Sequence, residues 1–164
     1  MGGQLEGIVK QAILLEQRGR DFYRGVATQA EAEAVREIFA TMAEEEERHI
    51  QALAELGKTL LAEEGGSLPL PQVQPALTVE AVLTDEVKRG IREAGYEAAA
   101  IYAAMALEEK AVAFYSEQAR ASQGEVAKLF SWLADWERTH LELLMALDED
   151  LRQRVWQDRR FWPF

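Results

Sequence analysis

The stretch LFSWLADWERTHLELLMAL at residues 129–147 repeats, without a gap, the pattern of IFATMAEEEERHIQALAEL at residues 38–56. Both stretches have apolar side chains at three- and four-residue steps, which is typical of an amphipathic helix. The alignment pairs the two histidines of the chain, and the glutamate three residues before each: His49 with His140, and Glu46 with Glu137. The second copy of this helix indicates an internal repeat.

The helix before each of these stretches is also duplicated. Residues 12–23 (AILLEQRGRDFY) align with residues 104–115 (AMALEEKAVAFY), which places Glu16 on Glu108. The repeated unit is therefore a pair of helices, and the chain contains two such pairs. We expect an all-α four-helix bundle.

The spacing of glutamate and histidine within each repeat suits a metal ion. Side chains three residues apart lie on one face of a helix, about one turn from each other, so Glu46 and His49 can hold one ion together. Glu137 and His140 can hold a second ion in the same way. With the glutamate of each preceding helix, the set becomes four carboxylates and two imidazoles, which is the donor set of di-iron and di-manganese bundles.

Charge and composition favour iron in such a site, with manganese as an alternative. Buried carboxylates need cations or protons, and two divalent ions would balance four of them. Oxygen-rich ligation with one imidazole per ion suits iron or manganese. The chain has no cysteine, which excludes thiolate zinc sites and cysteine-held iron–sulfur clusters. The competing interpretation is that these residues form ordinary ion pairs on helix surfaces.

The composition also limits the partners of the protein. The 164 residues are 48% hydrophobic, enough for one sizeable core, and carry a net charge of -11. This acidity argues against nucleic acid and anionic membranes as partners, because both are themselves negatively charged. No apolar run reaches the roughly 18 residues that a membrane span needs. We expect a soluble protein in the cytoplasm.

Apolar periodicity and helix-breaking residues predict four long helices, at about residues 5–29, 31–56, 96–121 and 125–147. Gly57 is a plausible end for the second helix. Within the acidic run at residues 44–47, Glu46 is expected to face inward with His49. The other three glutamates are expected to be solvated, as charged runs usually are.

A long connection separates the two helix pairs. Residues 57–77 contain glycines and prolines that cannot continue a helix: Gly65, Gly66, Pro69, Pro71 and Pro75. The connection either runs along the bundle or carries the chain to a partner subunit. Thr78 or Thr84 can cap the helical residues that lead into the third long helix.

The last residues, 148–164, are expected to form a short helical tail beyond a bundle domain at residues 1–147. The tail ends in side chains that are unfavourable in water: Phe161, Trp162, Pro163 and Phe164. We expect the tail to dock either on its own bundle or across the interface of a homodimer, where tryptophan, phenylalanine and arginine are enriched.

Together these motifs resemble the rubrerythrin-like branch of the ferritin-like superfamily, over nearly all of residues 5–147. The matching strings are LLEQRGRDFY and IFATMAEEEERH in the first half, and ALEEKAVAFY and LFSWLADWERTH in the second. The resemblance implies a ferritin-like bundle that binds two irons, often dimerises, and reacts with hydrogen peroxide or dioxygen. It also implies the ligand roles: terminal carboxylates Glu16 and Glu108, bridging carboxylates Glu46 and Glu137, and one histidine for each ion, His49 and His140.

The chain departs from that family in two respects. Rubrerythrins proper carry an iron centre held by four cysteines, which this chain cannot form, so an external electron donor is expected. They also carry an extra glutamate one turn after the ligand of the third helix, where this chain has Ala111, and Gly19 is the counterpart in the first repeat. The change favours oxidation of Fe(II) or scavenging of dioxygen relative to peroxidase chemistry. The two small residues either open a pocket beside the metals or permit close helix packing.

Four aromatic residues lie near these positions. Tyr23 and Tyr115 each follow the glutamate of their helix by seven residues, which returns them to the same face. They are candidates to donate a hydrogen bond to a ligating carboxylate and to pass an electron, and the alternative is a core tyrosine. Trp132 and Trp136 either carry electrons or are plain core residues.

The resulting hypothesis is a non-haem di-iron oxidoreductase that reduces hydrogen peroxide or dioxygen. One rival is a ferritin-like ferroxidase that handles iron. Another is a structural protein in which the metals only cross-link the helices. A manganese catalase and an oxygenase with an organic substrate are also compatible with the residues.

Overall fold

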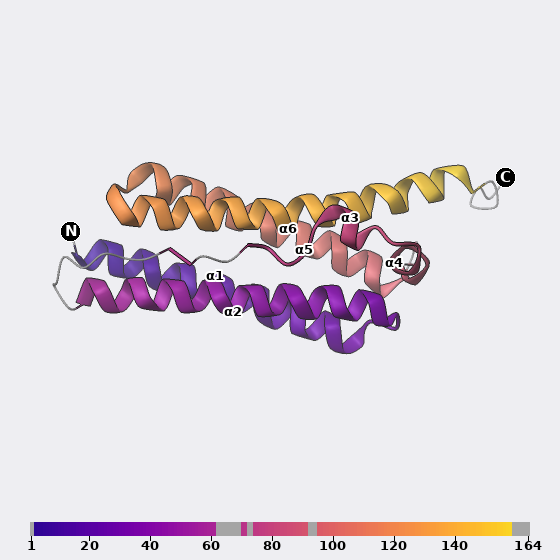
Figure 1. The fold of residues 1–164 in the computed structure, drawn as a ribbon, viewed down its shortest axis with the longest axis horizontal. Coiled ribbons are helices and arrows are strands. Elements are labelled where there is room, and N and C mark those ends of the chain that lie inside the picture. The colour runs from indigo at the N-terminus through magenta and orange to yellow at the C-terminus, as the bar shows by residue number, and fades with distance from the viewer. Residues whose placement is uncertain (1, 62–69, 72–73, 92–94, 159–164) are drawn as a thin grey trace.

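The computed structural model describes residues 2–61, 70–71, 74–91 and 95–158, and the chain forms no strand within them. Its helices are α1 (Gly2–Gln29), α2 (Glu33–Leu61), α3 (Val79–Val82), α4 (Asp85–Gly90), α5 (Tyr96–Ala121) and α6 (Gly124–Gln157). Figure 1 shows α1 and α2 as one antiparallel pair and α5 and α6 as another. The predicted all-α bundle of two helix pairs is confirmed.

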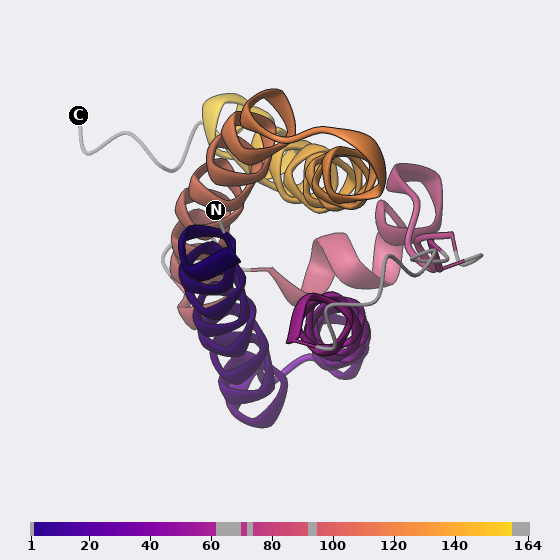
Figure 2. The same cartoon turned by 90° about the vertical axis from the view of Figure 1, so that its left-hand side faces the viewer.

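The view along the bundle shows how the pairs are arranged (Figure 2). Helices α1 and α5 lie side by side on one side of the bundle, and α2 and α6 lie on the other. The crossover, with α3 and α4, lies against the α2 and α6 side. The bundle therefore has one side covered by the crossover and one side formed by α1 and α5 alone, among the described residues.

The hydrophobic core is divided into two clusters along the bundle. The first lies where α1 meets α2 and includes Val26, Phe39 and Leu143. The second lies toward the α5–α6 connection and includes Leu53 and Phe130. The glutamates and histidines predicted to bind metal fall between these clusters in sequence, so apolar side chains close both ends of the polar site. Within the described residues, the chain has no helix that is long and apolar enough to span a membrane.

The predicted end of α2 at Gly57 is wrong, because the helix continues to Leu61. Glycine inside a helix costs about 1 kcal/mol relative to alanine, and packing can offset that cost. Here Leu53 and Leu56 are buried just before the glycine. A Cβ atom at Gly57 would meet a side-chain carbon of Val9 at 3.7 Å, so α1 packs closely against this turn.

Helix α6 extends ten residues beyond its predicted end at residue 147. Leu151 is buried, and the added turns carry intrahelical ion pairs, such as Arg154 Nε to Asp150 Oδ2 at 2.9 Å. The division proposed at residue 147 therefore falls within a continuous helix. The aromatic residues Phe161, Trp162, Pro163 and Phe164 lie outside the described residues.

Both predicted threonine caps in the crossover are confirmed. Thr78 accepts a hydrogen bond from the Ala81 N–H at the start of α3, and Thr84 accepts one from the Val87 N–H at the start of α4. Val87 is buried against the bundle. Gly65, Gly66 and Pro69 lie outside the described residues, while Pro71 and Pro75 lie in described, non-helical parts.

Candidate metal centre

The four long helices bring the six predicted ligands together in the middle of the bundle. None of them is more than 3% exposed. Their positions follow from the repeat: Glu16 on α1, Glu46 and His49 on α2, Glu108 on α5, and Glu137 and His140 on α6. A helix that buries two such polar residues on its inner face is stable only if they find partners, because an unpaired buried charge costs several kcal/mol.

These residues form two overlapping groups of possible ligands. Glu16, Glu46, His49 and Glu137 make one group, and Glu46, Glu108, Glu137 and His140 make the other. In each group one oxygen or nitrogen atom per residue lies within 4.8 Å of the others. Glu46 and Glu137 belong to both groups, which is the position of carboxylates that bridge two ions.

Both histidines turn Nδ1 toward the carboxylates. His49 Nδ1 lies 3.0 Å from Glu16 Oε2, 2.9 Å from Glu137 Oε1 and 3.5 Å from Glu46 Oε2. His140 Nδ1 lies 3.4 Å from an oxygen of Glu46, Glu108 and Glu137. One ring nitrogen carries at most one proton, so it cannot donate to three carboxylates. A cation between these atoms would satisfy all of them.

Buried polar atoms without hydrogen bonds show that the residues fit metal ions. Three such atoms have no hydrogen-bond partner among the described residues: Oε1 and Oε2 of Glu137, and Nδ1 of His140. Buried polar atoms are nearly always paired, so unpaired ones that point into a shared centre indicate a ligand. Carboxylate oxygens and imidazole nitrogens together are the donors that iron and manganese bind in proteins.

Electrostatics within the cluster lead to the same interpretation. Burial, and then the charges of Glu46 and Glu137, raise the pKa of Glu16 well above its ordinary 4.5. Burial and the charge of Glu137 raise the pKa of Glu108 in the same direction. Burial alone would lower the pKa of His49, but the charge of Glu137 and hydrogen bonds to glutamates raise it well above 6.5. The metal-free cluster therefore holds protons where cations would otherwise balance the charge.

Glu46 and Glu137, the two carboxylates that belong to both groups, behave differently. Burial would raise the pKa of Glu46, but its close contacts with Glu16, His140 and His49 outweigh burial and lower that pKa below 4.5. The pKa of Glu137 is also lowered: burial and the charge of Glu46 oppose this, and the two histidines outweigh them. The pKa values of the two carboxylates shared by both groups are thus lowered, while those of Glu16 and Glu108 are raised.

Tyr23 and Tyr115 donate hydrogen bonds across the repeats. Tyr23 Oη donates to Glu108 Oε1, and Tyr115 Oη donates to Glu16 Oε1. Each phenol therefore reaches the glutamate of the other helix pair and not the glutamate on its own helix. Burial, followed by the charge of the facing glutamate, raises the pKa of both phenols well above 10.0. They remain protonated donors that fix the orientation of the two carboxylates.

Glu45 is a buried part of the site that the sequence analysis missed. It was expected to be solvated, but its side chain is 0% exposed. Glu45 Oε2 accepts hydrogen bonds from His140 Nε2 at 2.6 Å and from Trp136 Nε1 at 3.2 Å, and Oε1 accepts one from the Ala76 N–H at 2.6 Å. The helical spacing held a usable signal, because Glu45 stands four residues before His49 on the inner face of α2.

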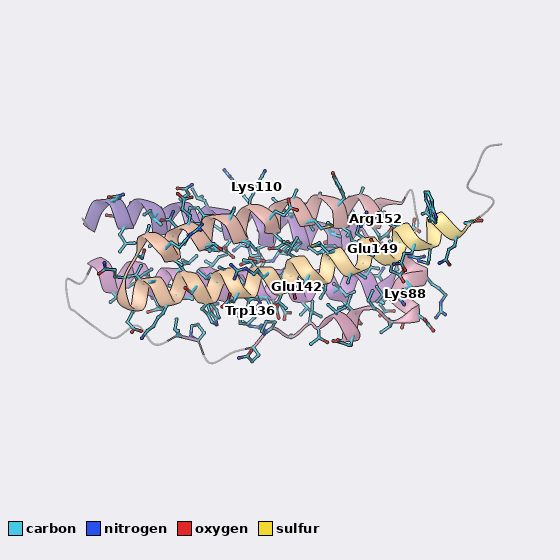
Figure 3. All side chains as sticks on the ribbon, turned by 90° about the horizontal axis from the view of Figure 1, so that it is seen from above. Lys88, Lys110, Trp136, Glu142, Glu149 and Arg152 are labelled. Carbon is cyan, nitrogen blue, oxygen red and sulfur yellow. The ribbon has the colours of Figure 1, made fainter. Side chains whose placement is uncertain are left out.

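The two tryptophans lie on the same side of the site. Trp136 packs edge-on against His49, with ring centroids 5.2 Å apart, and Trp132 does so at 5.6 Å. The two indole rings also contact each other at 5.1 Å. Figure 3 shows Trp136 on the edge of α6 next to the crossover. Trp136 thus contacts one histidine with its ring and, through Glu45, connects to the other.

The opposite side of the site contains a small cavity. Its volume is about 20 Å³, and it lies between α1 and α5 against the clustered carboxylates. Gly19 and Ala111 are among its lining residues, as are Leu15 and Leu107. A Cβ atom at Gly19 would lie 3.5 Å from Glu46 Cδ, so a larger side chain there would extend into this space. The open-pocket interpretation of these two small residues is therefore favoured over helix packing alone.

Comparisons with known proteins are consistent with this geometry. A family model described as rubrerythrin matches residues 7–147, and again residues 99–160. A search of curated proteins found no match. A solved structure of a hypothetical protein from Pyrococcus furiosus is similar in fold, with 27% sequence identity and a TM-score of 0.64. That similarity covers 92% of this chain and 91% of the Pyrococcus chain.

Proposed function

The chain belongs to the rubrerythrin family, and on this premise we propose that it is a di-iron oxidoreductase that reduces hydrogen peroxide or dioxygen. The six buried glutamates and histidines would hold the two ions. When bound, two ferrous ions supply the two electrons that such a reduction needs. Manganese suits the same donor atoms, so the proposal is tested with iron.

The cavity beside Gly19 and Ala111 is the observation that carries this proposal. About 20 Å³ is enough for one water-sized molecule, because a buried water needs roughly 10–15 Å³ of such space. Hydrogen peroxide and dioxygen are of that scale, and an organic substrate of an oxygenase is much larger. The cavity also touches four of the carboxylates, so a molecule in it lies next to the proposed ions.

The surrounding residues hold this centre in place. Tyr23 and Tyr115 fix the orientation of Glu108 and Glu16 through their hydrogen bonds. Phe39 packs against Tyr23, with ring centroids 5.9 Å apart, and Phe130 packs against Tyr115 at 6.0 Å. These phenylalanine rings keep the phenols from rotating away. Residues that hydrogen-bond to metal ligands and orient them are worth about 10- to 100-fold in metal affinity or activity.

Electrons would come from a separate donor, since the chain has no cysteine for a second iron centre of the four-cysteine type. Trp132 and Trp136 form an aromatic path that begins at the ring of His49. Trp132 is partly exposed and Trp136 is buried. The α6 surface around Trp132 is the place where this donor would deliver electrons.

A ferroxidase is the second candidate, and the surface above the cavity argues against it. A groove of about 330 Å³ between α1 and α5 is lined by Arg18, Lys110 and Leu15 among others. Leu15 also lines the small cavity, so the groove and the cavity are neighbours. Figure 3 shows Lys110 projecting from the outer face of α5. Two cationic side chains at this approach repel Fe²⁺ and leave a neutral oxidant unaffected.

The test is the reaction of the anaerobic protein, loaded with two Fe(II) per chain, with hydrogen peroxide or with air. The proposal predicts rapid formation of a diferric absorption band that a chemical reductant reverses through several cycles. A ferroxidase would instead react faster with air and continue to consume added Fe(II). A protein that binds both ions and reacts with neither oxidant would have only a structural site, and the proposal would be wrong.

A further inference from the structure

Glu45 connects the metal centre to the crossover through three hydrogen bonds. A tryptophan N–H and a backbone N–H can only donate, so both oxygens of Glu45 act as acceptors toward Trp136 and Ala76. The contact with His140 Nε2 is to the same Oε2 that accepts from Trp136. A carboxylate surrounded by donors in this way accepts from His140 as well. A proton of the His140 ring is thereby held on Nε2, while Nδ1 faces the cluster.

The first repeat has no equivalent of this interaction. Trp136 occupies the position in the second repeat that Glu45 occupies in the first, one residue before the bridging glutamate. An indole ring cannot accept the ring proton of His49. His49 Nε2 is buried and has no hydrogen-bond partner among the described residues. The two tryptophan rings contact His49 but give its ring no acceptor.

We propose that Glu45 is a positioning residue for His140, and that it makes the two metal positions unequal, with the tighter ion next to His140. A carboxylate that accepts the outer N–H of a ligating histidine fixes the tautomer and raises the basicity of the ligand nitrogen. The ion beside His49 lacks this support and exchanges more readily. This inference rests on the proposed two-ion function. It identifies the position beside His140 as the one that binds metal first and releases it last.

A purely structural role for Glu45 would be to tie the crossover to α2. That role needs only Oε1, which accepts the Ala76 N–H. Oε2 is instead directed at His140 and at Trp136, which are 95 and 91 residues away in the chain. Burying a further carboxylate beside an acidic cluster is unfavourable unless its hydrogen bonds compensate. The two roles differ in what they predict for metal affinity.

The first experiment titrates the protein with Zn(II), a redox-inert probe, against a competing chelator. Wild-type protein is expected to bind two ions with clearly different affinities. Glu45→Gln places an amide NH₂ group among N–H donors. It should lower the Zn(II) affinity of the tighter site about tenfold or more and leave the affinity of the weaker site unchanged. Glu44→Gln is the matched control, because Glu44 is exposed and the charge change is identical. It should bind as wild type does.

The second experiment needs no variant at Glu45, so it is independent of whether Glu45→Gln folds. Imidazole nitrogen NMR of the Zn(II)-loaded wild type should show two patterns, one for each histidine. The His140 Nε2–H should be shifted downfield and slow to exchange, while the His49 Nε2–H should not, with the spectrum of His49→Ala providing the assignment.

The outcomes separate this inference from the function on which it rests. Equal affinities in wild type, or two similar Nε2–H signals, would overturn the inference and leave the two-ion centre intact. So would a Glu45→Gln protein that binds both ions as wild type does, or one that weakens both sites equally. Failure of the wild type to bind a second ion would overturn the proposed function together with the inference.

Discussion

His49 and His140 hold equivalent places in the two repeats, and the side chains behind them differ completely. A carboxylate lies behind His140, and a pair of tryptophan rings lies behind His49. The tyrosines behave in the opposite way, since Tyr23 and Tyr115 make matching hydrogen bonds across the repeats. The comparison shows which parts of a duplicated site have stayed alike and which have diverged. The groups that face the cluster are paired, and asymmetry begins one layer further out.

Removing each histidine in turn should give the largest effect. His49→Ala and His140→Ala should each lower the stoichiometry from two ions to one. The remaining ion should be held tightly in His49→Ala and weakly in His140→Ala, with a difference of roughly tenfold to a hundredfold. Equilibrium dialysis against a chelator measures both quantities. Two variants with the same residual affinity would remove the distinction between the halves.

Filling the cavity should give the next largest effect. It tests the side of the site that faces away from Glu45. Gly19→Leu places a branched side chain against Glu46 and should slow the reaction with hydrogen peroxide on the order of a hundredfold, since small misplacements near reacting atoms have costs of that size. Gly25→Leu is the matched control on the same helix, where a Cβ meets nothing within 4 Å. Stopped-flow absorbance gives the rates. Metal content must be equal in both variants, and equal rates would contradict the pocket interpretation.

The two tyrosines make equivalent hydrogen bonds in the two repeats, so removing either hydroxyl should have the same effect. Tyr23→Phe leaves Glu108 without its phenol donor, and Tyr115→Phe does the same to Glu16. Both variants should weaken metal binding about tenfold, and by similar amounts. Calorimetric titration would measure the loss for each. A large effect in only one variant would show that the asymmetry extends to the residues on α1 and α5.

The metal-free protein should lose stability as the pH rises above 6.5, the ordinary pKa of a histidine. The folded-state pKa values of Glu16, Glu108, His49 and His140 are all raised, so their contribution to stability is present at low pH and disappears as the pH rises toward those values. Each proton retained only by the folded state costs about 1.4 kcal/mol per pH unit, or roughly 3 °C in the melting temperature. Thermal melts with a chelator present would measure this slope. Added metal should reverse it, and a flat or opposite slope would contradict the proton assignment.

The periodicity of the repeats was sufficient to predict the helices and the convergence of six side chains. Glu16 and Glu46 lie where apolar residues are otherwise expected, and a polar residue repeated at such a position indicates a shared centre. The end of α2 was not predictable, because close packing against Val9 overrides the local preference of Gly57. The extension of α6 beyond residue 147 did have local signals, because Leu151 continues the apolar spacing of Leu147 and Asp150 can pair with Arg154 one turn later.

Glu45 is the residue that the sequence analysis misplaced, because the acidic run outweighed the signal in its helical spacing from His49. It stands in a run of four glutamates, and such runs are normally solvated. Its burial depends on Trp136, 91 residues away, and on the Ala76 N–H of the crossover, whose position is set by tertiary packing. Aligning the repeats does pair Glu45 with Trp136, but an alignment does not show that the two side chains touch. Residues that support ligands across repeats are therefore the part of the site that requires a structure.

The most direct test of the account is anomalous diffraction from crystals of the protein given a single equivalent of Mn(II) per chain. We predict density within the buried cluster, between Glu46 and Glu137, with clearly higher occupancy next to His140 than next to His49. A second equivalent should fill the position next to His49. Equal occupancy of the two positions would contradict the role of Glu45, and metal bound elsewhere with the cluster empty would contradict the two-ion centre itself.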